Sequence, residues 1–377
     1  MFLSRSERSL LTEWWFTIDR PLLGLSLLLV VIGIVMLLSA SPPVALRFDL
    51  PPFYFVQRQF VFAVAGAALL LFCSFLSVSS IRRLAALLFV GALLAMIWVL
   101  IFGPELNGAQ RWVRLFGVSL QPSELLKPAF VILTAWAIAE GQKRQDVPAF
   151  SIAIGLYLIS ALLLILQPDF GQTLLLTATW GVMFFLGGLA WGWVALFLGF
   201  GVGLLVFAYH FLPHVALRIH HFLDPTGENG QISRALEAFR QAGWFGRGPG
   251  EGSLVDDYLP DAHNDFIFAA IADEFGVFAC LLLLFIYGGI VFLSLMRVRH
   301  LQDGFLQLAV SGLMVMFALQ TLIHMAVNLG LIPAKGMTLP LISYGGTSLV
   351  GSVLLLGMVL ALTRRLPGRA DYRKFVL

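Results

Sequence analysis

The segment Tyr258–Glu274, YLPDAHNDFIFAAIADE, leads directly into the apolar run FGVFACLLLLFIYGGIVFLSL of residues 275–295. The junction joins a long polar stretch to a run that is long enough to cross a bilayer as a helix. Asp261, His263 and Asp265 lie at the junction, and carboxylates in or beside a bilayer are so costly that a function is their default interpretation. The sequence therefore predicts a membrane helix whose polar end carries a functional site.

The whole chain has the composition of a helical membrane protein. Of its 377 residues, 59% are hydrophobic and 12% are charged, whereas soluble domains contain about 25% charged residues. We expect an all-α integral membrane protein that forms one domain over residues 1–377. Ten apolar runs predict its spans, at about 21–40, 58–77, 84–103, 123–141, 148–167, 170–189, 191–212, 265–295, 304–327 and 345–363. The net charge of +3 concerns topology and predicts no binding to nucleic acid.

The distribution of lysine and arginine orients these spans. The short connections at Arg82-Arg83, Lys143-Arg144 and Arg297–Arg299 are basic, which assigns them to the cytoplasm. Both termini are then cytoplasmic, and the motif-rich segments face outward. The largest outer loop, 213–264 between the seventh and eighth spans, includes Gln231–Trp244, whose pattern predicts an amphipathic interfacial helix.

A polar cavity is predicted where the fourth span begins. Glu124 and Lys127 are three residues apart and therefore share a helix face. A lysine about one turn inside the bilayer needs a partner or a wet cavity. Asp169, at the start of the sixth span, is the expected partner of Lys127. Independent snorkelling of the lysine to the surface is the alternative.

Three further features have two interpretations each. Ser343, Gly345 and Gly346 lie at the start of the last span, where a helix N-terminus could bind a phosphate or where glycines could allow tight packing. Asp265 could be functional or could be the N-cap of its helix. Four histidines lie in or just before the outer loop, His210, His214, His220 and His221. Their spacing is not that of a strong metal site.

Five motifs occur in a fixed order along the chain. They are NGAQRW (107–112), QPSELLK (121–127), QPDFG (167–171), YLPDAHNDFIF (258–268) and KGMTLPLISYGGTS (335–348). Together they resemble the SEDS family (shape, elongation, division and sporulation), and the KGMTLP form resembles its division members more than its elongation members. The resemblance extends over all ten predicted spans.

The resemblance implies a peptidoglycan glycosyltransferase that polymerises lipid II at the outer face of the cytoplasmic (inner) membrane during cell division, at the septum. Its implied partners are membrane lipid, a class B penicillin-binding protein (an FtsI-like transpeptidase) and other divisome membrane proteins. Asp265 matches the family's essential aspartate, and Lys127 and Asp169 match its buried ion pair, with Glu124 beside them. Asp261 stands where the family usually has a glutamate, which is a departure from the family's pattern.

These expectations assign a chemical role to each candidate. Asp265 would be the general base, and Arg111, Arg218 and Lys335 would stabilise the leaving pyrophosphate, with Mg²⁺ or Mn²⁺ as a conceivable cofactor. Asp261 and His263 would shape the loop around Asp265. Two more acids, Asp273 and Glu274, are expected two to three turns deeper in the same helix, in contact with neighbouring helices. The alternative functions are a lipid II flippase, which the intramembrane ion pair would suit, and a non-catalytic divisome scaffold.

Overall fold

The computed structural model describes residues 10–105, 109–115, 118–144, 146, 148–188, 231–252, 262–333 and 336–365, with isolated residues between 192 and 211. Within them the chain is mostly helical. The helices are α1 (Leu10–Thr17), α2 (Arg20–Ala40), α3 (Pro42–Arg47), α4 (Tyr54–Phe75), α5 (Val78–Phe102), α6 (Pro122–Lys143), α7 (Ala149–Leu166), α8 (Phe170–Leu186), α11 (Gln231–Ala242), α13 (Ile267–Val298), α14 (Gly304–Asn328) and α15 (Gly346–Leu362). The strands β1 (Val113–Leu115) and β2 (Val118–Leu120) pair antiparallel, with Arg114 opposite Ser119.

Nine of the described helices lie where membrane spans were predicted, while α1, α3 and α11 lie outside those spans. Seven of them, α2, α4, α5, α6, α7, α13 and α14, are long and apolar enough to cross a membrane, and α8 and α15 are shorter apolar helices. These helices support a multi-pass membrane protein. The predicted span at 191–212 lies largely outside the described residues.

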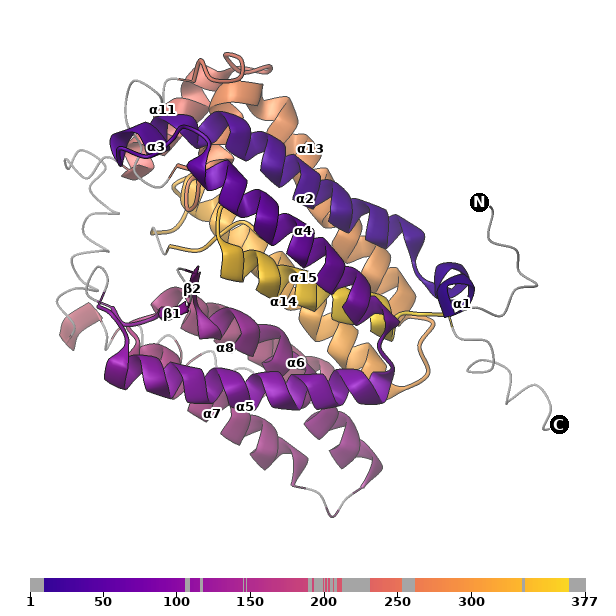
Figure 1. The fold of residues 1–377 in the computed structure, drawn as a ribbon. Helices are drawn as coiled ribbons and strands as arrows, with labels where there is room; N and C mark the ends of the chain where they lie inside the picture. The colour runs from indigo at the N-terminus through magenta and orange to yellow at the C-terminus, as the bar shows by residue number, and fades with distance from the viewer. Residues whose placement is uncertain are drawn as a thin grey trace.

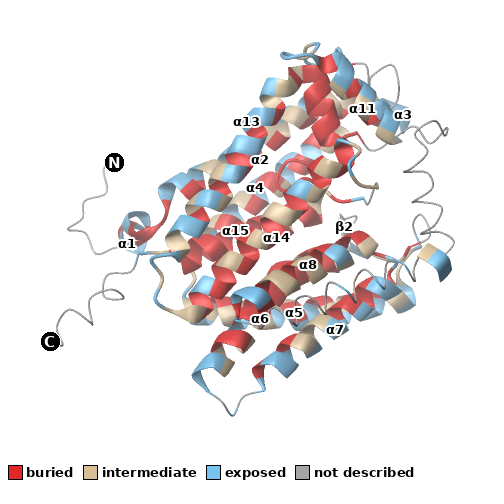
Figure 2. Cartoon of the chain, turned by 180° about the vertical axis from the view of Figure 1, so that it is seen from behind, coloured by how far each residue is buried: buried red, intermediate tan, exposed pale blue. Residues whose placement is uncertain are grey.

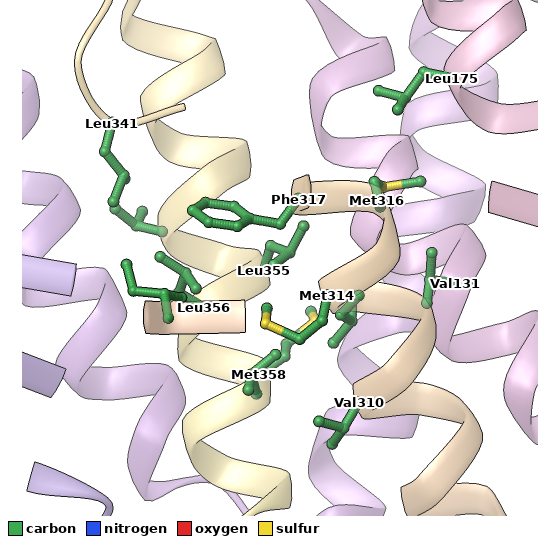
Figure 3. Close-up of a cluster of buried hydrophobic side chains, with 14 of the residues drawn as sticks. Val131, Leu175, Val310, Met314, Met316, Phe317, Leu341, Leu355, Leu356 and Met358 are labelled. Atoms are coloured by element: carbon green, nitrogen blue, oxygen red, sulfur yellow. The ribbon is translucent and has the colours of Figure 1, made fainter. Parts of the chain in front are cut away.

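Helices α6, α14 and α15 form the centre of the bundle. They lie between a group containing α2, α4 and α13 and a group containing α5, α7 and α8 (Figure 1). Figure 3 shows the packing at this centre, where Phe317 and Met314 of α14 lie against Leu355 and Leu356 of α15. Exposed residues gather on the outer helices (Figure 2), and many of them are large and apolar, such as Phe285. An apolar periphery of this kind is suited to contact with lipid.

The loops predicted to share a side of the membrane also share an end of the bundle. At one end, the Tyr344 N–H donates to the His263 carbonyl over 3.0 Å, and the Gln121 N–H donates to Thr347 Oγ1 over 3.2 Å. At the other end, Lys143 Nζ lies 3.4 Å from Asp303 Oδ1. In Figure 1 the first end is marked by α11 and the β1–β2 hairpin, and the other by α1.

Helix α13 is interrupted at Gly276, whose backbone has φ 79° and ψ −179°. The turn after α11, Gly243–Gly248, packs into this interruption, and we call it the inserted turn. On one side of Gly276, the Arg247 and Gly248 N–H groups donate to the Asp273 and Glu274 carbonyls, each over 3.0 Å. The inserted turn thus occupies carbonyls that a continuous helix would bond internally.

On the other side of Gly276, two N–H groups of α13 donate to carbonyls of the inserted turn. The Val277 N–H donates to the Gly243 carbonyl and the Phe278 N–H to the Trp244 carbonyl, each over 3.2 Å. In an unbroken helix these N–H groups would bond to residues 273 and 274. The inserted turn therefore provides partners for the Asp273 and Glu274 carbonyls and for the Val277 and Phe278 N–H groups.

The interruption changes the expected location of two acids. Asp273 and Glu274 precede Gly276 by three and two residues, so they lie at the break and not within a continuous membrane helix. Asp273 Oδ1 is 3.8 Å from Arg247 Nε, and both acids accept backbone bonds from the inserted turn. The expected contact with a neighbouring helix holds for Glu274, whose side chain interacts with Ser39 of α2. The break itself was not expected, because a segment distant in sequence creates it.

Candidate functional site

Asp265 lies in the turn that precedes α13, at the polar end of the bundle, and is half-buried. The N-cap position of α13 is Phe266, whose side chain makes no capping hydrogen bond. The cap comes from another helix, since Asn328 Oδ1 accepts from the Ala269 N–H over 3.0 Å. The same amide donates to the Asp265 carbonyl over 3.0 Å. The N-cap position predicted as an alternative role for Asp265 thus belongs to its neighbour.

The segment between α14 and α15 passes directly beside the Asp265 carboxylate. A methyl group placed on Gly336 would lie 3.4 Å from Asp265 Oδ2. Ser343 Oγ accepts from the Leu339 N–H over 2.8 Å and donates to the Asn264 carbonyl over 2.7 Å. We call residues 336–344 the packed loop, and it contacts the turn of Asp265 through Ser343 and Gly336.

His263 occupies an aromatic environment next to Asp265. Its ring centroid is 4.6 Å from that of Phe55 and 5.3 Å from that of Tyr344. Burial lowers the pKa of the His263 imidazole from 6.5 to about 4, so the ring is neutral near pH 7. This geometry suits the loop-shaping role expected of His263, because an uncharged ring can pack between aromatic groups.

The predicted polar cavity contains a buried ion pair, although its members differ from the prediction. Lys127 Nζ lies 2.8 Å from Glu124 Oε2 and donates to Gln320 Oε1 over 2.9 Å. Gln172 Nε2 donates to Glu124 Oε1 over 2.8 Å. All four residues are buried, with exposures of 4% for Lys127, 3% for Glu124, 4% for Gln320 and 4% for Gln172. A charge at this depth requires such partners.

The direct Lys127–Asp169 pair is wrong. Glu124, one helical turn away in the same helix, reaches the lysine first. Asp169 instead has Arg111 Nη1 at 4.0 Å and accepts from Gln121 Nε2 over 3.1 Å. Burial raises the pKa of the Asp169 carboxyl, and the nearby Arg111 opposes that shift. Gln172 still connects Asp169 to the Lys127–Glu124 pair. Its backbone N–H donates to Asp169 Oδ1 over 3.4 Å, and its side chain donates to Glu124.

Of the three cations predicted to stabilise the pyrophosphate, Arg111 lies among the described residues. Arg111 is bound to the turn between α7 and α8, where its Nε donates to the Gln167 carbonyl over 2.9 Å and a second nitrogen donates to the Pro168 carbonyl. Arg218, Lys335 and the loop candidate Asp261 lie outside the described residues. Their roles stay predictions.

Packing accounts for one of the glycines at the start of α15. A methyl group on Gly346 would lie 2.5 Å from the ring of Phe62 in α4. The Gly345 N–H donates to Gln59 Oε1 over 3.4 Å. The contact with Phe62 of α4 therefore requires a small residue at position 346. A phosphate-binding role for Ser343, Gly345 and Gly346 stays a prediction.

One face of α14 connects these groups, and the sequence reasoning missed it. Gln320, His324 and Asn328 are spaced by four residues, so they lie in a row. Gln320 Nε2 donates to the Thr338 carbonyl over 3.2 Å, and His324 Nδ1 is 2.6 Å from the Met337 carbonyl. Polar residues with helical spacing inside an apolar run were the signal that could have revealed this face.

The sequence left open whether a divalent cation, Mg²⁺ or Mn²⁺, serves as a cofactor. Within the described part of the chain, no group of three or more His, Cys, Asp or Glu side chains is placed to hold a metal ion. The residues described near Asp265 therefore do not form a metal site by themselves.

Comparison with known proteins places this geometry in context. Residues 20–367 match the FTSW_RODA_SPOVE family, described as "Cell cycle protein". The chain is 43% identical over 367 residues to the "Probable peptidoglycan glycosyltransferase FtsW" of Caulobacter vibrioides (strain NA1000 / CB15N), covering 97% of this chain and 94% of that protein.

Solved structures share the fold. A chain in "Structural coordination of polymerization and crosslinking by a peptidoglycan synthase complex" has a TM-score of 0.77 and 31% identity, covering 93% of this chain and 98% of that one. The rod shape determining protein RodA of Thermus thermophilus has a TM-score of 0.68 and 29% identity, covering 93% and 97%.

Proposed function

Because the chain belongs to the FtsW/RodA/SpoVE family of cell cycle proteins, we propose that it is a peptidoglycan glycosyltransferase that polymerises lipid II. The observation that carries the chemistry is the position of Asp265. Its half-buried carboxylate lies where an apolar helix meets polar loops, and its turn is held by Asn328. Such a site lets a polyprenyl tail remain in the bilayer while the attached sugars react at its surface.

The reaction joins the sugar of one lipid-linked molecule to another. The 4-hydroxyl oxygen of a GlcNAc residue attacks the anomeric carbon of a MurNAc residue, and the bond from that carbon to undecaprenyl pyrophosphate breaks. The hydroxyl proton passes to the Asp265 carboxylate, and the bonding electron pair leaves with the pyrophosphate. General base catalysis of this kind contributes about 10²–10⁴-fold to a rate.

The leaving pyrophosphate requires positive charge. Arg218 and Lys335, together with Arg111, are the candidates, with a divalent cation as a further source. Addition of EDTA followed by Mg²⁺ or Mn²⁺ would test the cation. Polymerisation that stops with EDTA and recovers with either ion supports it, whereas an unchanged rate removes it from the account.

The protein's proposed location is the cytoplasmic membrane at the division septum. Ten spans with both termini in the cytoplasm place Asp265 outside, with residues 191–212 as the seventh span. Single cysteines test this arrangement. A cysteine at exposed Glu251 should react with an impermeant maleimide in whole cells, and one at exposed Gln302 should not. The reverse labelling would contradict the orientation.

The proposed partner is a class B penicillin-binding protein that crosslinks the new strand. The structural similarity to a chain from a peptidoglycan synthase complex supports this partner. Co-purification of the two proteins, compared with that of an unrelated membrane protein, tests the interaction. Other divisome membrane proteins are expected in the same assembly.

Substitution of Asp265 tests the proposed reaction. Purified protein with its cognate transpeptidase should polymerise lipid II, and Asp265→Ala should reduce the rate by about 100-fold or more. Asp303→Asn is the matched control, because Asp303 lies at the opposite end of the bundle. Normal polymerisation by Asp265→Ala would reject the assignment of the base.

The same preparation separates the alternative functions. A flippase would move lipid II across protein-only liposomes in a manner sensitive to Lys127→Ala. A scaffold would leave lipid II unchanged in every variant. The burial of Lys127 and its pairing with Glu124 and Gln320 favour a structural role for the lysine.

A further inference from the structure

Asn328 is completely buried at the end of α14, and its side chain bonds to the start of α13, to the turn before it and to its own helix. Its Oδ1 accepts from the Ala269 N–H, and its Nδ2 donates to the carbonyls of Asp265 and His324, over 3.0, 3.0 and 2.9 Å. These partners fix the orientation of the amide, since a carbonyl can only accept and an N–H can only donate. Asn328 therefore binds both sides of the turn that carries the proposed base.

The need for this amide follows from the sequence of the turn. The first N–H groups of a helix have no partner within the helix, and phenylalanine at the N-cap, Phe266, has no side-chain acceptor. The Ala269 N–H is shared between Asn328 and the Phe266 carbonyl, the latter at 3.0 Å. A side chain on α14 thus supplies the capping interaction that the local sequence lacks.

Residues on the same face of α14 also place the packed loop beside Asp265. Gln320 donates to the Thr338 carbonyl, and His324 donates to the Met337 carbonyl through Nδ1. The next residue towards α14, Gly336, borders Asp265 Oδ2. The polar face of α14 therefore sets the position of both the Asp265 backbone and the packed loop beside the Asp265 carboxylate.

We infer that Asn328 is a positioning residue for Asp265, which holds the turn so that the carboxylate meets the acceptor hydroxyl. This inference rests on the proposed function. Only two side-chain torsions separate the Asp265 backbone from its carboxylate, so the backbone largely determines where the carboxylate lies. A displacement of about 1 Å at a reacting group can reduce a rate about 100-fold.

Substitution with leucine and aspartate distinguishes positioning from simple support. Asn328→Leu has a similar size and removes both kinds of hydrogen bond. It should lower the kcat of lipid II polymerisation about 10- to 100-fold, with a KM within about twofold of wild type. Thr321→Val is the matched control, because this buried hydroxyl bonds only to the Phe317 carbonyl of its own helix.

Asn328→Asp provides a readout that a loss of stability would not produce. A protonated carboxyl can accept from the Ala269 N–H and donate one of the amide's two hydrogen bonds, to the Asp265 carbonyl, but a carboxylate has no donor for that carbonyl. The variant should therefore work at low pH and lose kcat as pH rises, which adds an alkaline limb that wild type lacks. Hydrogen exchange at the Ala269 amide should become faster over the same pH range.

Three results decide the inference. The new alkaline limb together with a reduced kcat for Asn328→Leu supports it. A normal kcat for Asn328→Leu, with Asp265→Asn inactive, overturns the positioning role while the proposed base stands. Normal activity of Asp265→Asn rejects the proposed function itself, whatever the exchange rate at Ala269, and so overturns the inference as well.

Discussion

Lys127 and Glu124 form an ion pair within the bundle, and its environment sets the energetic consequences of substitution. Both side chains are buried, and each has a further amide partner, Gln320 for the lysine and Gln172 for the glutamate. Removing one member of such a pair leaves an uncompensated charge, which typically costs about 3–5 kcal/mol. Removing both members costs less, because no charge remains to be paired.

We therefore expect Glu124→Gln to lower the free energy of unfolding in detergent by about 3–5 kcal/mol. Adding Lys127→Met should recover a large part of that loss. Asp303→Asn is the control, since its pair with Lys143 is exposed by 40% and 55% and should contribute about 0–1 kcal/mol. Equal effects of Glu124→Gln and Asp303→Asn would show that the buried pair does not stabilise the bundle.

The buried ring of His263 predicts a dependence of stability on pH. Its pKa falls from 6.5 to about 4 in the folded protein, so between these values the unfolded chain binds more protons. Stability from this group is complete above the higher pKa and is lost as pH falls towards the lower one.

This contribution can be measured by substitution. His263→Phe should fill the same aromatic site, next to Phe55 and Tyr344, and should weaken the decrease in melting temperature between pH 7 and pH 5. The exposed His300→Gln serves as the control. An equal decrease in wild type and His263→Phe would mean that His263 does not cause the dependence.

The residue pattern predicted the polar cluster but not all of its pairs. Burial of Lys127 followed from its depth in the fourth span, and Glu124 followed from helical spacing. The pairing of Asp169 with Arg111 depends on the turn between α7 and α8, whose shape is not encoded by residue spacing. Asn328 escaped notice for a similar reason, because its partners lie about sixty residues away, with a separation of 59 to Ala269.

At the scale of the element, the break in α13 depends on two glycines that face each other. A methyl group on Gly276 would lie 2.3 Å from the Trp244 carbonyl oxygen, and one on Gly246 would lie 2.3 Å from the Glu274 carbonyl. Both glycines also have positive φ, at 79° and 76°, which other residues adopt only with strain. The backbone contact between α13 and the inserted turn thus excludes side chains at both positions.

Gly276→Ala should therefore separate the inserted turn from α13. Strain from the positive φ alone costs roughly 1–3 kcal/mol, and the clash adds to it. Hydrogen exchange at the Val277 and Phe278 amides should become faster. Gly288→Ala in the same helix has open space around it and should be neutral or slightly stabilising. Normal exchange in Gly276→Ala would contradict the insertion.

The sequence could not predict this break. Residues 275–295 form one apolar run, and an isolated glycine inside a membrane helix does not by itself indicate an interruption. The geometry arises because residues 243–248 replace the helix's own hydrogen bonds, and that pairing is non-local. The start of α6 at Pro122 and that of α14 at Gly304 were predicted to within one residue, since proline or aspartate marks them locally.

At the scale of the whole molecule, the buried ion pair, the packed loop and Asp265 meet through α14. This helix contacts α6, α8, α13 and α15, and its polar face reaches from Lys127 to the Asp265 turn. Apolar runs were enough to predict the helical bundle, and the distribution of lysine and arginine predicted that the motifs share one side of it. Which helices pack at the centre required the structure, because every span is apolar and composition does not rank them.

The most direct test of the account measures glycan formation from lipid II by the purified protein together with its transpeptidase. Asp265→Asn retains the size of the side chain but cannot accept a proton. If Asp265 is the base, wild type forms long glycan strands, and Asp265→Asn forms about 100-fold less polymer in the same time. The melting temperature of the variant should be unchanged. Equal strand formation by the two proteins would contradict the central claim that the Asp265 carboxylate is the base.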